Sequence, residues 1–153
     1  MSIISKYIHE GLLHAKATAK DRVEAIRLSG DLLVRNNLAK EAYSEGMIAT
    51  LKEHGPYFVI APGIAMPHAR PEDGALEMGV SIVTLKEPVV FGHSSNDPVE
   101  IVIGLCAVDH EQHLELLSKV VDLLSDETLK EALLQAGSAQ EMLNVIERGD
   151  RND

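Results

Sequence analysis

The spacing of apolar positions predicts that the chain begins with helices, continues with strands and ends with helices. Apolar residues recur every three or four positions over residues 21–35 and again over residues 39–54, as expected for one face of a helix. Gly55 and Pro56 should end the second helix, because proline cannot continue one. The inward positions of that second helix are Tyr43, Met47, Ile48 and Leu51.

The middle of the chain has the patterns of strands. Residues 57–61 form a short β-prone run, and residues 78–82 alternate between apolar and small side chains. Residues 89–91 could form another short strand or a sheet edge. Residues 99–108 are almost continuously apolar, which is typical of a central strand covered on both faces.

Three helices are expected after this apolar run. They should begin near Asp109, Asp126 and Ser138, since each of these side chains can cap a helix N-terminus. We therefore predict an α/β fold, with a mixed β-sheet flanked by helices, in a single domain that covers residues 1–153.

The charge of the chain narrows the range of partners. Acidic residues outnumber basic ones by 24 to 14, for a formal net charge of −10, and lysine and arginine form no cluster. Nucleic acids and anionic membrane surfaces are therefore unfavourable partners. No apolar run approaches the ~20 residues that a membrane span requires, so no membrane insertion is expected. The single cysteine fits a reducing compartment, and the first residues do not resemble a signal peptide, so we expect a cytoplasmic protein.

The segment 55–74 is the most unusual part of the sequence, with four prolines and three glycines among its 20 residues. His68 lies between Pro67 and Pro71, whose rings restrict the loop. Neutral imidazole is a nucleophile near neutral pH and can attack phosphorus. Arg70 could contact phosphoryl oxygens with its several N–H donors. A histidine in a loop can equally be an ordinary surface residue, and the residues alone leave this open.

The motif Gly63-Ile64-Ala65-Met66-Pro67-His68 resembles the phosphorylation site of the mannitol/fructose-type enzyme IIA family (type 2) of the bacterial phosphotransferase system. The similarity includes residues 96–99, which lead into the apolar run, and residues 107–109, which lead into a histidine-bearing helix. The longer block over residues 55–71 is similar to the ascorbate-specific subgroup. The resemblance covers nearly the whole chain.

This resemblance implies a phosphotransferase component with a phosphohistidine intermediate. His68 would accept a phosphoryl group from the carrier HPr and pass it to a cysteine of enzyme IIB, and the membrane permease, enzyme IIC, would take part indirectly. His113 would support the transfer as the second histidine of the family. Mannitol-type members also carry an arginine in the second helix, whereas residues 47–56 here contain Lys52 and no arginine. We expect Arg70 to supply that charge.

Two other function classes remain open. Some relatives with this fold have a regulatory, nitrogen-type signalling role that is not coupled to transport. A metal-dependent hydrolase could use His68, His110 and His113, but the sequence has no HExxH or CxxC motif. No metal or other cofactor is expected, and no Gly-Lys-Ser/Thr sequence follows the glycines as a nucleotide-binding loop would require. Cys106 lies in the apolar run and is expected to be a core residue rather than a phosphoryl acceptor.

Overall fold

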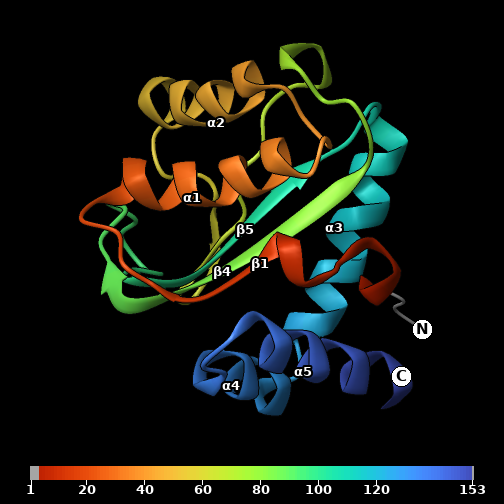
Figure 1. Cartoon of the computed structure of the whole chain (residues 1–153). Helices are drawn as coiled ribbons and strands as arrows, with labels where there is room; N and C mark the ends of the chain where they lie inside the picture. Colours follow the sequence, from red (N-terminus) through yellow and green to blue (C-terminus); the bar gives the residue numbers. More distant parts are fainter. Residues whose placement is uncertain (1–3, 153) are drawn as a thin grey trace.

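The computed structural model describes residues 4–152 and contains one five-stranded mixed β-sheet (Figure 1). The strand order is β1-β4-β5-β3-β2. β1 is parallel to β4, and β3 is parallel to β5, whereas the β4–β5 and β2–β3 pairs are antiparallel. The strands are β1 (Leu13–Ala17), β2 (Val59–Ala61), β3 (Ile64–Ala65), β4 (Gly79–Val89) and β5 (Val99–Cys106).

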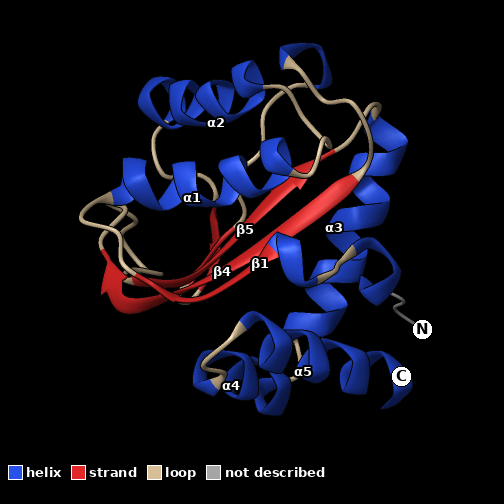
Figure 2. Cartoon of the chain, in the orientation of Figure 1, coloured by secondary structure: helices blue, strands red, loops and turns tan. Residues whose placement is uncertain are grey.

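Helices cover both faces of the sheet, as Figure 2 shows. On one face lie α1 (Arg22–Arg35) and α2 (Glu41–His54). On the other lie α3 (His110–Leu124), α4 (Glu127–Gln135) and α5 (Ala139–Asn152). Short 3-10 helices occur at Ile4–Tyr7, Glu10–Leu12 and Pro71–Asp73. Within residues 4–152, none of the helices has the length and apolar character needed to cross a bilayer.

The predicted central strand is confirmed. Ile101, Ile103 and Leu105 of β5 pack in the core beneath α3–α5, and the alternating positions Val102 and Cys106 pack beneath α1 and α2. Each face of β5 is thus buried by a different set of helices, which explains why this segment is nearly all apolar.

The predicted helix starts are also confirmed by their caps. The carboxylate of Asp21 accepts a hydrogen bond from the Glu24 N–H, and that of Asp109 accepts one from the Gln112 N–H. Asp126 caps α4 in the same way, with its carboxylate accepting from two backbone N–H groups. Gly55 ends α2 with a φ of 78°, a conformation that favours glycine.

The sheet differs from the prediction at three places. The sequence pattern assigned no element to Leu13–Ala17, yet these residues form β1 through parallel pairing with β4. β3 was not expected as a strand separate from β2, and Gly63 makes the turn between them. Residue 89 ends β4 rather than beginning a further strand. β1 and β3 form by parallel pairing with β4 and β5, strands far away in the sequence, which local periodicity does not report. Residue 89 belongs to β4 because it pairs with Val99 of the next strand, β5.

Candidate functional site

The candidate functional site lies where two parallel strands end. β3 and β5 are adjacent and parallel, so their carboxyl ends lie at the same edge of the sheet. The loop after β3 carries His68, and α3, which follows β5, carries His113. The connectivity of the sheet therefore brings these two histidines together from distant positions in the chain.

The rings of His68 and His113 lie 4.8 Å apart, measured between their centroids. Both line a surface cleft of about 630 Å³. One wall of the cleft is α2, another is the loop that runs from His68 to Asp73, and a third is the first turn of α3. His68 and His113 therefore face one cavity that is open to solvent.

The ring of His68 is half-buried and held in one orientation. It packs in T-shaped arrangements with two aromatic rings, those of Phe58 at 5.3 Å and Tyr57 at 5.9 Å between centroids. Its Nδ1 lies 3.0 Å from the carbonyl oxygen of Met66. A carbonyl oxygen can only accept, so Nδ1 carries the proton. Nε2 then keeps its lone pair, and this tautomer can act as a nucleophile through Nε2.

The surroundings of His68 favour its neutral form. Partial burial lowers the pKa of His68, because the interior disfavours the charged ring, and the hydrogen bond to the Met66 carbonyl opposes that shift in part. Since the net direction is downward from about 6.5, the ring is mostly uncharged at neutral pH. The lone pair on Nε2 is available under these conditions.

His113 lies one turn into α3, whose N-terminus is capped by Asp109. Burial lowers the pKa of His113, and repulsion from His68 and from His110 lowers it further. A neutral imidazole can donate one hydrogen bond, and the end of a helix that exposes its N–H groups favours anions. His113 is therefore suited to donate a hydrogen bond to an anion beside His68.

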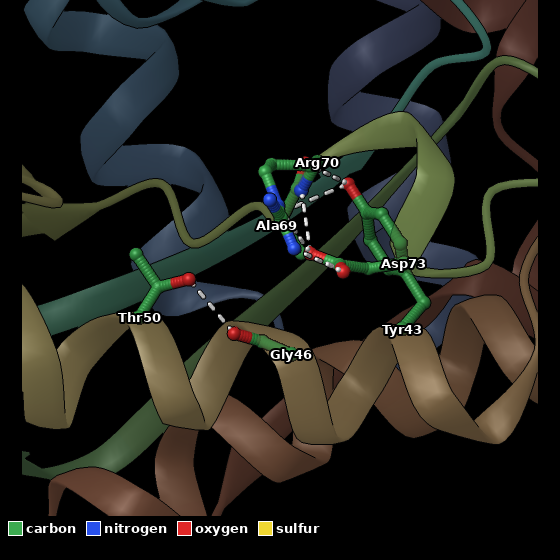
Figure 3. A network of polar contacts seen from close by, with 6 residues as sticks. All are labelled: Tyr43, Gly46, Thr50, Ala69, Arg70 and Asp73. Atoms are coloured by element: carbon green, nitrogen blue, oxygen red, sulfur yellow. Dashed lines mark hydrogen bonds and ion pairs between the residues drawn. The ribbon is translucent and has the colours of Figure 1, made fainter.

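Arg70 also lines the cleft, but its guanidinium is paired with the carboxylate of Asp73. Its Nη2 forms an ion pair with the Asp73 carboxylate at 3.1 Å, and its Nε lies 3.4 Å from the other oxygen of that carboxylate (Figure 3). The pKa of Asp73 is lowered, mainly by its hydrogen bond from Arg70. The Arg70 side chain is 75% exposed, so it can move toward the cleft without leaving a buried position.

Comparisons with known proteins identify the family of this chain. Residues 6–149 match the family described as "Phosphoenolpyruvate-dependent sugar phosphotransferase system, EIIA 2". The chain belongs to this family. A protein of Salmonella typhimurium named "Ascorbate-specific PTS system EIIA component" is 42% identical over 137 residues, which are 89% of each chain.

Solved structures of this type have the same fold. The mannitol-specific cryptic phosphotransferase enzyme IIA of Escherichia coli is 36% identical, with a TM-score of 0.84 over 95% of this chain and 98% of that one. A complex of enzyme IIAMTL with phosphorylated enzyme IIBMTL, also from Escherichia coli, matches with 26% identity and a TM-score of 0.80. That match covers 92% of this chain and 97% of the other. The protein is thus a phosphocarrier component of a sugar phosphotransferase system.

α2 presents no arginine to the cleft of this family member. Its side chains that line the cavity include Thr50, Glu53 and His54, whereas Lys52 is not among the lining residues. The Thr50 hydroxyl donates to the Gly46 carbonyl at 2.8 Å. Arg70 is therefore the arginine that lines this cleft, and it comes from the loop rather than from the helix.

Cys106 has the environment of a core residue. Its side chain is buried, and burial raises the pKa of its thiol to about 12. A thiol of that kind is not a nucleophile near neutral pH. Over the residues that the structure describes, no three His, Cys, Asp or Glu side chains are placed to hold a metal ion, the three histidines considered above included.

The roles of three residues of the cleft were not predicted from the sequence. Tyr43 is a core position of α2, as predicted, and its hydroxyl in addition contacts the backbone of Ala69 in the loop after His68, which was not expected. Asp73 binds Arg70 three residues away, a spacing that was visible in the sequence but had no assigned role. Gly46 lets α2 approach that loop, and nothing in the local pattern distinguished it from other helix positions.

Proposed function

We propose that His68 is the phosphorylated residue, and that it accepts its phosphoryl group from phospho-HPr through Nε2. The observation that carries this proposal is the fixed orientation of the ring: Nδ1 is hydrogen-bonded to the Met66 carbonyl, which leaves the lone pair of Nε2 available. The Nε2 lone pair forms the new N–P bond as the donor's bond to phosphorus breaks, and the donor keeps that electron pair. Phosphoryl transfer of this kind depends mainly on alignment and charge stabilisation.

We assign two supporting roles within the cleft. His113 donates a hydrogen bond to the phosphoryl oxygens, which its ring can reach because it lies beside that of His68. Arg70 neutralises part of the phosphoryl charge once its guanidinium turns from Asp73 toward His68. Both residues line the cleft with His68, which supports these roles.

The second half of the cycle passes the phosphoryl group to a cysteine of enzyme IIB, from which a permease of the enzyme IIC type uses it in uptake. The acceptor thiolate attacks phosphorus, the N–P bond breaks, and Nε2 recovers its lone pair. Exposed apolar side chains near the cleft, Tyr57, Val108 and Leu114 among them, offer a surface for such partners. The named relatives suggest that the sugar is ascorbate or a similar compound, and a cytoplasmic location suits this role.

The test is incubation with enzyme I, HPr and phosphoenolpyruvate, followed by mass spectrometry of the intact protein and its peptides. We expect one acid-labile phosphate on His68 that is lost in His68→Ala. His9→Ala is the matched control, since His9 is exposed and lies outside the cleft. A phosphate that remains in His68→Ala would place the acceptor elsewhere.

The partner is tested separately. Phosphorylated protein is mixed with an ascorbate-type enzyme IIB and, in parallel, with a mannitol-type one, and the transfer of label to each cysteine is followed. We expect faster transfer to the ascorbate-type protein. A phosphorylated His68 that transfers to neither protein would favour the regulatory role over transport.

A further inference from the structure

Both peptide groups that flank His68 are tied to a single residue of the sheet, Leu105. On the N-terminal side, the carbonyl of Pro67 accepts a hydrogen bond from the Leu105 N–H at 3.1 Å. On the C-terminal side, the N–H of Ala69 donates to the hydroxyl of Tyr43 at 3.2 Å. The same hydroxyl donates to the Leu105 carbonyl at 2.6 Å. The loop is thus bound to β5 directly before His68 and through the phenol directly after it.

We propose that Tyr43 is a positioning residue for phosphoryl transfer, whose hydroxyl fixes the backbone after His68 and thereby the direction of Nε2. This inference rests on the proposed function of His68. Tyr43 lies on α2 and lines the same cleft as the two histidines. Figure 3 shows its hydroxyl pointing toward the backbone of Ala69. It does not contact the reacting atoms, and it acts through the loop.

A phenol is well suited to this task because it donates and accepts at one oxygen. Its hydroxyl hydrogen is donated to the Leu105 carbonyl, and its oxygen accepts a hydrogen bond from the Ala69 N–H. The Ala69 carbonyl oxygen also lies 3.3 Å from the phenol oxygen. Burial raises the pKa of Tyr43 far above its usual range, so the hydroxyl keeps its proton. Tyr43 is only 1% exposed, so water does not readily replace its hydroxyl as the hydrogen-bond partner of the loop.

The same face of α2 supports the loop a second time. Gly46 lies one turn after Tyr43, and a Cβ atom added there would come within 3.2 Å of the Ala69 Cβ. The absence of a side chain lets the helix approach closely enough for the phenol to reach the loop backbone. Tyr43 and Gly46 together make α2 the support on which the residue after His68 rests.

Loss of the phenol oxygen would release this support while leaving the aromatic ring in the core. The Ala69 N–H would lose its partner, and the peptide after His68 could rotate. Rotation there weakens the Nδ1 hydrogen bond to Met66 that selects the reactive tautomer. Misplacement of a reacting group by about 1 Å can cost on the order of 100-fold in rate.

The experiment compares Tyr43→Phe with the unmodified protein in single-turnover transfer from phospho-HPr. We expect the rate constant at saturating phospho-HPr to fall by about 10- to 100-fold, while the half-saturating concentration stays the same. Tyr7→Phe removes a phenol oxygen outside the cleft and is the chemical control. Ser81→Ala is the stability control, because its buried hydroxyl donates to the Ser29 carbonyl within the core and outside the cleft. An equal loss of rate in Ser81→Ala would overturn the positioning role.

A second readout does not depend on transfer. The 15N chemical shifts of the His68 ring report which nitrogen carries the proton. We expect a single Nδ1–H tautomer in the unmodified protein and a mixture in Tyr43→Phe. If the unmodified protein accepts no phosphate on His68, the proposed function fails, and the tautomer comparison still tests Tyr43. An unchanged tautomer in Tyr43→Phe would overturn the inference, whatever the transfer rate.

Discussion

The imidazole of His113 lies tilted by 51° against that of His68, with 4.8 Å between the ring centroids. His68 lies in the loop after β3, and His113 lies on α3, which follows the neighbouring parallel strand β5. The two residues are therefore close in space although they are far apart in the sequence. Burial lowers the pKa of both rings, so the neutral form of each predominates near neutral pH. One nitrogen can then act as a nucleophile while the other ring donates a hydrogen bond.

We predict that His113→Ala slows acceptance of the phosphoryl group by about 10- to 100-fold, the effect of losing one donor to a developing charge. His113→Gln keeps an N–H donor and should recover part of the rate. The measurement is single-turnover transfer from phospho-HPr, with thermal unfolding to establish that both variants fold. Equal rates in His113→Ala and the unmodified protein would remove His113 from the site.

The rate of phosphoryl acceptance should fall at acidic pH with a midpoint below 6.5. The sign follows from the lowered pKa of His68: the ring stays neutral until the pH drops below that pKa, and protonation then blocks Nε2. Transfer rates between pH 5 and 8, combined with an NMR titration of the two rings, measure this dependence. A midpoint above 6.5 in both measurements would contradict the effect of burial.

The same pKa shift affects stability. Because the unfolded chain binds a proton at His68 at higher pH than the folded chain does, the folded state should lose stability as the pH falls below about 6.5. The comparison is urea unfolding of the unmodified protein and of His68→Gln over this range. The variant should lose less of its free energy of unfolding on acidification. An identical loss in both proteins would show that other groups determine the acid sensitivity.

The ion pair between Arg70 and Asp73 sets up a competition for the guanidinium. Arg70→Gln should slow transfer by about 10-fold through loss of a charged contact to the phosphoryl group, an effect of the size expected for a charge-assisted hydrogen bond. Asp73→Asn should free the guanidinium and slow transfer less than Arg70→Gln does. Arg148→Gln on α5 removes the same charge outside the cleft and serves as the control. If Arg70→Gln and the control behave alike, charge support comes from elsewhere.

Gly46→Ala separates the stability of the helix from the position of the loop. Alanine gains about 1 kcal/mol of helix propensity over glycine, whereas its Cβ meets Ala69 and Asp73 at 3.2–3.3 Å and displaces the loop. We expect a change of less than about 1 kcal/mol in the free energy of unfolding, together with slower phosphoryl transfer. Gly137→Ala is the control, since a Cβ there has open space up to 4.0 Å. Unchanged transfer in Gly46→Ala would show that the loop tolerates displacement.

Much of the fold was predictable because it is encoded locally. The caps at Asp109 and Asp126 and the terminating Gly55 are short-range signals, and the structure has helices that begin or end at each. The apolar run that forms β5 was also predictable, since burial on both faces removes polar positions. β1 was missed because its five residues include His14 and Lys16, and its strand character comes from pairing with β4.

The candidate site was predictable only in part, and for a physical reason. His68 has a distinctive sequence around it, and the resemblance pointed to His113. The role of Tyr43 could not be predicted, because helical periodicity reports its apolar ring and not the partners of its hydroxyl. Those partners, Ala69 and Leu105, belong to other elements and meet it only after folding.

The carboxylate of Asp150 on α5 accepts hydrogen bonds from the backbone N–H groups of Ile4, at 3.3 Å, and of Ser5, at 2.7 Å. The beginning and end of the described chain therefore lie side by side, away from the first turn of α3 (Figure 1). A fluorophore or surface tether attached at either end would leave the histidine cleft clear. Encounters with carrier proteins could then be followed one molecule at a time without obstruction of the docking surface.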